Sequence, residues 1–229
     1  MTATYDTFIP PPRPPVRSRR TRLVARWFGL RWDAPKDVEH DGVVPSLLQR
    51  LLPSAGAITL LCGPSGSGKS SLLRQMHAQM CNDLTRRWID LNDLTLPDVP
   101  LVDCFDRNLP LKRVLSMLGA VGLAEAWTYL RTPGELSEGQ RWRFRVALAL
   151  SQARHRDLRQ PIIACDEFAA LLDRVTACAV SRALRRAISR DSGMSAVVAT
   201  SHDDLIRALA PEQIVRCDFT RVWIESRAK

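Results

Sequence analysis

The segment GPSGSGKS, residues 63–70, constrains the fold more than any other stretch of this 229-residue chain. It fits the spacing G-x-x-x-x-G-K-[ST], follows the apolar run AITLLC (57–62) and precedes SSLLRQMHAQMC (70–81), which has helical apolar spacing. A buried strand, a glycine-rich loop and a helix in that order predict backbone N–H groups arranged around phosphates at a helix N-terminus. A chance glycine- and serine-rich turn is the alternative, and the flanking strand and helix argue against it.

The predicted nucleotide site runs through this loop and one residue beyond it. Lys69 would reach the β- and γ-phosphates of ATP and act in catalysis, and the Ser70 hydroxyl would hold Mg²⁺. The other predicted nucleotide contacts are Gly63, Pro64, Ser65, Gly66, Ser67, Gly68 and Ser71.

Two further apolar runs end in residues suited to phosphate chemistry. In PIIACDEF (161–168), Asp166 would orient Mg²⁺ through water and Glu167 would polarise the attacking water. Alone, such a run is typical of a strand that leaves the core, but downstream of a phosphate loop it predicts a catalytic pair. SAVVATSH (195–202) repeats the arrangement, and His202 would reach the γ-phosphate, although a histidine at a strand end is more often structural.

Strands and helices alternate along most of the chain, which predicts a mainly parallel α/β sheet covered by helices on both faces. Further strands are predicted at 22–30, 86–90, 213–217 and 221–225. Helices are predicted at 44–52, 110–122, 123–131, 138–153, 173–190 and 203–209. The helical stretch from about 105 to 153 breaks the alternation and predicts a helical subdomain.

The net charge of +9 and the pI near 9.9 favour polyanions as partners, whether nucleic acid, phosphates or an acidic membrane surface. Part of the excess lies in residues 1–21, a Pro- and Arg-rich stretch that we predict to be a disordered tail. A nucleic-acid-binding arm and a solvated tail are the alternatives for it. The remaining residues, 22–229, are enough for one substantial domain.

The composition also bears on the compartment of the protein. The six cysteines form no C-x-x-C pair, which predicts reduced thiols rather than zinc ligands or disulfides. No apolar run approaches the 18 residues of a membrane span, and the N-terminus has no apolar core of a secretory signal. We therefore expect a soluble, cytoplasmic protein.

The stretch GELSEGQRWRFRVALAL, residues 134–150, has the features of a capped helix start. Ser137 can accept a hydrogen bond from the backbone of Gln140 while the Gln140 side chain reaches back, which is the capping box. Three arginines follow, at Arg141, Arg143 and Arg145. Glu138 either points away from the predicted nucleotide or pairs with an arginine, for which Arg141 is the candidate, and the roles of the other two arginines stay open.

The order of these motifs resembles the ATP-binding cassette (ABC) family of ATPases. LSEGQ (136–140) matches four of the five positions of the family signature L-S-G-G-Q, ALLD (170–173) retains the acid of the D-loop, and His202 falls where the switch histidine belongs. The likeness extends from about residue 22 to the end. ELSEGQRWRFRVA, DEFAALLDRVTA and ATSHDDL are more closely similar to soluble cassette ATPases sometimes fused to a predicted acetyltransferase domain, of which this chain would be the ATPase part.

The resemblance implies the P-loop NTPase fold of the ABC type and a head-to-tail homodimer with two ATP molecules between the subunits. Each nucleotide would lie between the loop 63–71 of one subunit and Ser137, Gly139 and Gln140 of the other, with Asp173 also in contact. A serine hydroxyl, glycine N–H groups and a helix N-terminus are donors suited to a γ-phosphate.

The chain departs from the family between the phosphate loop and the signature. Family members carry a glutamine there that touches Mg²⁺ and couples to partner domains, whereas LPDVPLVDCFDRNLPLKRV (96–114) contains none. Asp103 and Asp106 are the two residues that we consider as its replacement.

The resemblance also implies an aromatic residue that stacks on adenine after the first strand. Phe28 is favoured over Trp27 and Trp32, because WFG is similar to the family's aromatic-glycine pair. Packing of all three rings in the core is the alternative.

Three functions are compatible with these motifs. We favour a soluble, non-transport ATPase whose ATP-driven dimer closes on a macromolecule such as nucleic acid, because the coupling glutamine is missing and the chain is basic. The alternative is the nucleotide-binding subunit of a membrane transporter that engages a separate permease. Lys69, Asp166 and Glu167 together argue against an inactive binding module.

Overall fold

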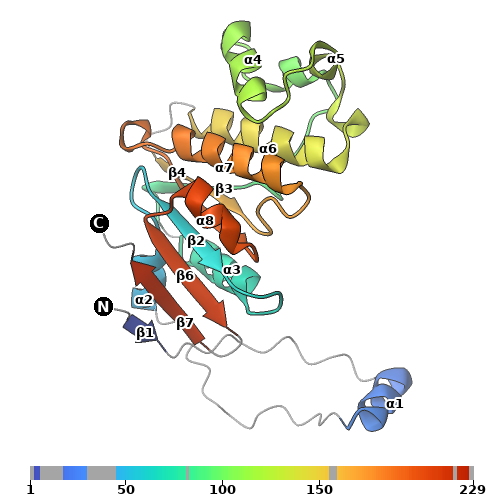
Figure 1. Cartoon of the computed structure of the whole chain (residues 1–229), viewed down its shortest axis with the longest axis vertical. Helices are drawn as coiled ribbons and strands as arrows, with labels where there is room; N and C mark the ends of the chain where they lie inside the picture. Colours follow the sequence, from blue (N-terminus) through green and yellow to red (C-terminus); the bar gives the residue numbers. More distant parts are fainter. Residues whose placement is uncertain are drawn as a thin grey trace.

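A computed structural model of the chain describes residues 3–5, 18–29, 45–80, 83–154, 159–218 and 221–226. Within these ranges a seven-stranded sheet has the order β1-β7-β6-β2-β5-β4-β3 (Figure 1). The strands are β1 (Ala3–Tyr5), β2 (Ile58–Cys62), β3 (Arg86–Asp90), β4 (Gln160–Cys165), β5 (Ser195–Thr200), β6 (Gln213–Asp218) and β7 (Arg221–Ser226).

The described α-helices are α1 (Arg19–Trp27), α2 (Pro45–Leu51), α3 (Lys69–Met80), α4 (Leu111–Ala120), α5 (Ala126–Tyr129), α6 (Glu138–Ala153), α7 (Arg174–Ala187) and α8 (Ile206–Leu209). Short 3₁₀ turns lie at η1 (Leu101–Cys104), η2 (Pro133–Glu135), η3 (Arg190–Ser192) and η4 (Asp203–Leu205). Within the described ranges, every helix lacks the length or the apolar character that crossing a bilayer demands.

The centre of the sheet is parallel. Strands β6, β2, β5, β4 and β3 pair in parallel, whereas β7 runs antiparallel to β6 and β1 antiparallel to β7. The register places Cys62 opposite Thr200 and Cys165 opposite Val198. The carboxyl ends of β2, β5 and β4 therefore adjoin one another at the same edge of the sheet.

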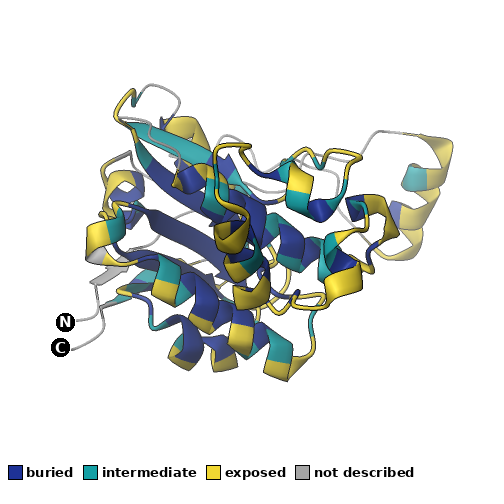
Figure 2. Cartoon of the chain, turned by 90° about the horizontal axis from the view of Figure 1, so that it is seen from above, coloured by how far each residue is buried: buried dark blue, intermediate teal, exposed yellow. Residues whose placement is uncertain are grey.

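Each face of the sheet has its own apolar core, which explains why β2, β4 and β5 are apolar at almost every position. On one face Leu61, Val197 and Val215 pack with α2 and α3. On the other, Leu60 and Val198 pack with residues of α6 and α7. Figure 2 shows the buried residues in the sheet and on the inner sides of the helices, with the exposed residues on their outer sides.

The predicted α/β fold is confirmed for most elements. The strands expected at 57–62, 86–90, 161–166, 195–200, 213–217 and 221–225 correspond to β2 to β7, and the helices expected around the phosphate loop, at 138–153 and at 173–190 correspond to α3, α6 and α7. Between β3 and β4 the chain is helical, and α4 and α5 stand above the sheet in Figure 1. The bounds of the helical subdomain, about 105 to 153, stay a prediction.

The strand predicted at 22–30 is wrong, because residues 19–27 form helix α1. Its N-cap residue Ser18 accepts from the Thr21 backbone N–H at 3.1 Å, and the Ser18 N–H donates to the Thr21 hydroxyl oxygen at 2.8 Å. This capping box starts a helix where the apolar run alone indicated a strand.

The predicted tail, residues 1–21, contains described structure at both ends. Ala3–Tyr5 form β1, which pairs with β7, and α1 begins at Arg19. The rest of that stretch lies outside the described residues, and its division from a domain at 22–229 stays a prediction.

Candidate functional site

The phosphate loop connects the buried strand β2 to the start of α3, as predicted. A Cβ atom at Gly63 would lie 2.0 Å from the Cys217 carbonyl oxygen of the neighbouring strand β6, so this position accepts glycine alone. The Lys69 ammonium donates to the Gly63 and Pro64 carbonyl oxygens, at 2.7 Å in each case. The lysine side chain therefore lies across the beginning of its own loop.

The loop has the properties that a polyphosphate ligand requires. Gly66 and Gly68 have φ angles of 80° and 89°, a left-handed conformation in which glycine is favoured and which turns the backbone within the loop. The Ser67 hydroxyl is buried and has no hydrogen-bond partner among the described residues. An orphaned donor beside a glycine-rich loop at a helix N-terminus fits a phosphate group.

The predicted acidic pair follows β4 at the same sheet edge. Asp166 is half-buried and its carboxylate accepts from the Glu167 backbone N–H at 3.0 Å, whereas Glu167 is exposed. Glu167 and Ala169 have φ angles of 51° and 59°, which non-glycine residues rarely adopt. The Phe168 N–H donates to the Ala199 carbonyl oxygen at 2.7 Å and fixes this strained turn against β5.

His202 follows β5, between the ends of β2 and β4. Its backbone N–H donates to the Thr200 hydroxyl oxygen at 3.2 Å, and that hydroxyl donates to the Phe168 carbonyl oxygen at 3.3 Å. The Cys62 thiol donates to Asp203 at 2.7 Å, directly linking the residue before the phosphate loop to the residue after the histidine. The structure thus brings the loop, the acidic pair and His202 to adjoining strand ends.

Burial and hydrogen bonding shape the thiol and carboxylate that make this link. Burial, then the hydrogen bond to Asp203, raises the pKa of Cys62 to about 12. The same thiol hydrogen bond, followed by that from Arg216 at 2.7 Å, lowers the pKa of the Asp203 carboxyl. A neutral thiol and an ionised carboxylate therefore face each other at neutral pH.

Asp90 is an acidic residue at this edge that we missed in the sequence. It ends β3, lies opposite Ala164 on β4, and is half-buried. Burial raises the pKa of its carboxyl most, the Asn92 backbone N–H lowers it, and the charges of Asp93 and Asp166 raise it. The sequence does contain a signal for Asp90, because the predicted strand RRWID ends in an aspartate just as PIIACD does.

Among the described residues, no three His, Cys, Asp or Glu side chains gather as they would around a metal ion. The predicted magnesium site relies on Ser70 and Asp166, with the remaining ligands coming from phosphate oxygens and water. Mg²⁺ in nucleotide sites is commonly held by one or two carboxylates together with substrate phosphates, so two protein ligands suit this chemistry.

The predicted capping box at the start of α6 is confirmed. Ser137 accepts from the Gln140 backbone N–H at 3.3 Å, and the Gln140 side-chain oxygen accepts from the Ser137 N–H at 3.1 Å. In Figure 1 the start of α6 lies in the helical part of the chain, apart from the connection between β2 and α3. The structure therefore does not bring Ser137, Gly139 and Gln140 to the phosphate loop of the same subunit.

The three arginines of α6 each hold a different loop. Arg141 donates to the carbonyl oxygens of residues 133, 134 and 136, at 3.0 to 3.2 Å, so its predicted pairing with Glu138 is corrected. Arg143 donates to the Gly122 carbonyl oxygen at 2.7 Å. Arg145 donates to the carbonyl oxygens of Leu91 and Asn92, at 3.0 and 2.7 Å. The three arginines therefore attach loops to α6 by hydrogen bonds, and the local sequence cannot indicate which loop each one contacts.

Asp173 is the N-cap residue of α7. Its carboxylate accepts from the Thr176 N–H at 3.0 Å, and the hydrogen bonds from Thr176 lower its pKa. A Cβ at Gly139 would lie 3.3 Å from the Leu172 side chain, so the signature turn and the D-loop pack together in one chain.

The predicted adenine contact is not brought to the phosphate loop. Phe28 follows α1, which lies apart from the sheet in Figure 1, and both Phe28 and Trp27 are exposed, at 74% and 73%. The alternative of three rings packed in the core is wrong for these two. Trp32 lies outside the described residues.

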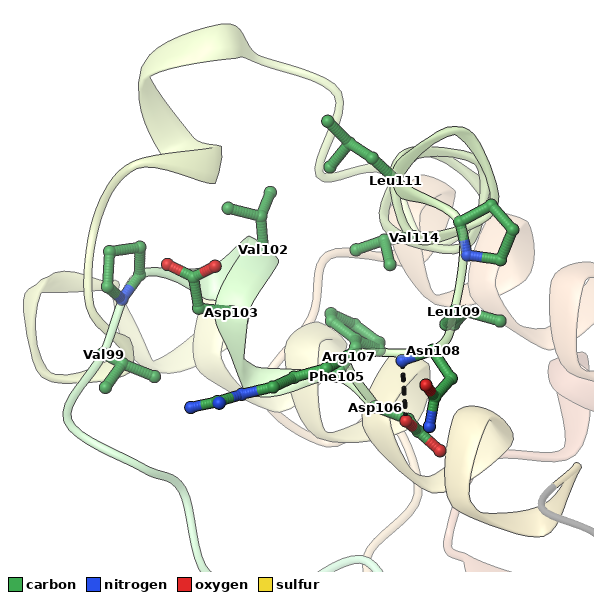
Figure 3. A pocket seen from close by; sticks show the side chains of 12 residues that line it. Val99, Val102, Asp103, Phe105, Asp106, Arg107, Asn108, Leu109, Leu111 and Val114 are labelled. Carbon is green, nitrogen blue, oxygen red and sulfur yellow. Dashed lines mark hydrogen bonds between the residues drawn. The ribbon is translucent and has the colours of Figure 1, made fainter.

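Asp103 and Asp106 line a groove of about 760 Å³ in the segment 99–114 (Figure 3). Both carboxylates are exposed, and Asp106 accepts from the Asn108 backbone N–H at 2.9 Å. Apolar side chains surround them, namely Val99, Val102, Phe105, Leu109, Leu111 and Val114. Neither Asp103 nor Asp106 ends a strand, whereas Asp90 ends β3, which pairs with β4.

The fold and the adjoining strand ends define a P-loop nucleotide-binding protein of the α/β class. No family model matches the chain. A lipoprotein-releasing system ATP-binding protein LolD from Maricaulis maris is 30% identical over 204 residues, covering 73% of this chain and 84% of that protein. The chain belongs to the ATP-binding cassette family of ATPases.

Two further proteins are similar to the chain, one in sequence and one in fold. A methionine import ATP-binding protein MetN from Thermobifida fusca is 27% identical over 187 residues, and this chain spans about half, 55%, of its length. The cassette MJ0796, in a dimeric post-hydrolysis state bound to ADP and Pi, is similar in structure with a TM-score of 0.59 and 22% identity, covering 78% of this chain and 89% of that one.

Proposed function

We propose that the chain binds and hydrolyses ATP at the interfaces of a head-to-tail homodimer and serves as the nucleotide-binding subunit of a membrane transporter. The observation that carries the ATPase part is the placement of a complete phosphate loop beside Asp166, Glu167 and His202 at adjoining strand ends. The likeness to MetN and LolD supports the transport role over the soluble, non-transport role that we favoured from the sequence.

In this proposal the loop 63–71 cradles the phosphates with backbone N–H groups and the positive end of α3. Lys69 leaves the carbonyl groups of Gly63 and Pro64 to neutralise the β- and γ-phosphates. Glu167 accepts a proton from the attacking water, and His202 donates to the γ-phosphate. Ser70 and Asp166 hold Mg²⁺, which neutralises phosphate charge when bound.

The second half of each site comes from the other subunit. The start of α6 lies apart from the chain's own phosphate loop in Figure 1, and a helix start with a glycine N–H favours an anion. A second copy, rotated head to tail, supplies these donors to the γ-phosphate and places Asp173 near the same interface. The dimeric MJ0796 cassette supports such an assembly.

A separate permease is the proposed partner, and it engages the groove at 99–114 from the cytoplasmic side of the membrane. The groove joins an apolar lining, including the 59% exposed Leu111, to the charges of Asp103, Asp106 and Arg107. This mixture fits a short amphipathic segment of a membrane protein with a basic edge.

The test of the partner is to capture proteins from solubilised membranes with ATP and the Glu167→Gln variant, in which the dimer is trapped. We expect a multi-span membrane protein that is lost when Leu111→Glu is added and retained with Leu84→Glu, a control in the turn before β3 where the leucine is more exposed, at 85% against 59%. If nucleic acid or a soluble protein is captured instead, and its capture is unaffected by Leu111→Glu, the result would favour the non-transport role.

A further inference from the structure

A path of hydrogen bonds joins α6 to the catalytic edge of its own subunit. By catalytic edge we mean the edge of the sheet where β2, β4 and β5 end at the phosphate loop, Asp166 and His202. The Arg145 guanidinium donates to the carbonyl oxygens of Leu91, at 3.0 Å, and Asn92, at 2.7 Å. Both residues directly follow β3, and the Leu91 N–H donates to the Ala164 carbonyl oxygen at 2.9 Å. Ala164 lies on β4, two residues before Asp166, so the path ends at the strand that carries the acidic pair.

The turn that Arg145 holds also sets the position of Asp90. The Asp90 carboxylate accepts from the Asn92 N–H at 2.9 Å, within the same turn whose carbonyl groups face the guanidinium. Arg145 is half-buried, and its hydrogen bond to the Leu91 carbonyl oxygen is partly buried, whereas the hydrogen bond to Asn92 is exposed. Hydrogen bonds from a charged donor are stronger than those between neutral groups, which makes this attachment firm.

Strand β3 and helix α6 are attached at their other ends as well. The Arg87 guanidinium, near the start of β3, donates to the Gln152 carbonyl oxygen near the end of α6 at 2.6 Å. Both arginines donate to backbone carbonyl groups, Arg87 from β3 to α6 and Arg145 from α6 to the turn that follows β3. Only the Arg145 contact adjoins the catalytic edge. Comparing substitutions of Arg145 and Arg87 therefore distinguishes an effect on the position of catalytic residues from a general loss of stability.

We propose that Arg145 is a positioning residue that makes the catalytic edge of one subunit respond to ATP bound by the other. The inference rests on the proposed head-to-tail dimer, in which Ser137 and Gln140 face the partner's nucleotide whereas Asp166 faces the subunit's own. ATP that engages the start of α6 fixes this helix, and Arg145, about two turns further along, fixes the turn at residues 90–92. Hydrolysis in each site then depends on occupancy of the other.

The test compares Arg145→Ala, Arg145→Lys and the matched control Arg87→Ala in the full chain, by thermal unfolding and steady-state ATP hydrolysis. Arg145→Ala is expected to lower kcat about tenfold with KM within about twofold, because it removes an interaction that matters in the transition state. Arg145→Lys should recover part of kcat, since it keeps a charged donor but not the position of the single guanidinium nitrogen that donates to both carbonyl oxygens. Arg87→Ala should lower the unfolding temperature but keep kcat within about twofold of the wild type.

Two results would overturn the inference: unchanged kcat in Arg145→Ala, or equal losses of kcat in Arg145→Ala and Arg87→Ala. Where Arg145→Ala fails to fold, Arg145→Gln, which keeps one amide donor, replaces it in the same comparison. A wild-type chain that hydrolyses no ATP, or whose Glu167→Gln variant stays monomeric with ATP, would refute the proposed function itself and the inference with it.

Discussion

A methyl group added at Gly63 of the phosphate loop would clash with the backbone of β6, and this substitution tests the loop as the nucleotide site. A Cβ at Gly63 would lie 2.0 Å from the Cys217 carbonyl oxygen and 2.9 Å from the Ser67 hydroxyl oxygen. Real Cβ atoms essentially never approach other heavy atoms within 3.0 Å, and the carbonyl belongs to the backbone of β6. The loop must therefore move by about 1 Å, because close-packed strands yield little.

Gly63→Ala is expected to cost about 1–3 kcal/mol of stability, the usual penalty for overpacking a rigid interior. A loop movement of about 1 Å misplaces the groups that bind the phosphates, and misplacements of this size can cost about a hundredfold. We therefore expect the affinity for ATP to fall about a hundredfold. The measurement is titration calorimetry with ATP and Mg²⁺, after thermal unfolding has shown that the variant is folded.

Gly119→Ala is the matched control, because Gly119 lies in α4 with no atom within 4 Å of an added Cβ. Alanine is favoured over glycine inside a helix by up to about 1 kcal/mol, so this variant should be slightly stabilised and should bind ATP as the wild type does. Equal ATP affinity in the folded Gly63→Ala variant and the control would refute the assignment of the loop.

Two further predictions concern Asp203 and the thiols of Cys62 and Cys217, on the strands next to the phosphate loop. Because hydrogen bonds from Cys62 and Arg216 lower the pKa of Asp203, its carboxylate stabilises the fold above the unfolded pKa of about 3.9 and loses this contribution as pH falls through the lower folded value. The difference in unfolding temperature between the wild type and Asp203→Asn should thus shrink from pH 7 to pH 2.5, and a constant difference would contradict it. Burial raises the pKa values of Cys62 and Cys217 to about 12, so both thiols should escape iodoacetamide at pH 8 until urea unfolds the chain. Peptide mapping by mass spectrometry measures this, and native labelling at the unfolded rate would disprove the protection.

The elements that local sequence specifies were the ones predicted well. The phosphate loop, the runs ending at Asp166 and His202, and the capping box at Ser137 each have a fixed spacing that carries its own physical reason. The sheet followed from strands that are apolar at almost every position, because burial on both faces removes the alternation of exposed strands.

The elements that failed depend on tertiary contacts or on a competing local signal. Residues 19–27 form a helix because the Ser18 and Thr21 side chains cap it, a short-range effect that outweighed an apolar run. Asp90 and Arg145 acquire their surroundings from strands and loops more than 50 residues away. Sequence spacing cannot reveal such neighbours until the pairing of β3 with β4 is known.

The most direct test of the account is the mass of the Glu167→Gln variant in solution with saturating ATP and Mg²⁺, measured by light scattering after size exclusion. Glutamine keeps the shape of the side chain but accepts no proton from water, so ATP should bind and persist. The account predicts a nucleotide-dependent dimer with twice the chain mass of 25.7 kDa, and a monomer without ATP. A variant that binds ATP yet stays monomeric would contradict the shared site between Lys69 of one subunit and Ser137 of the other.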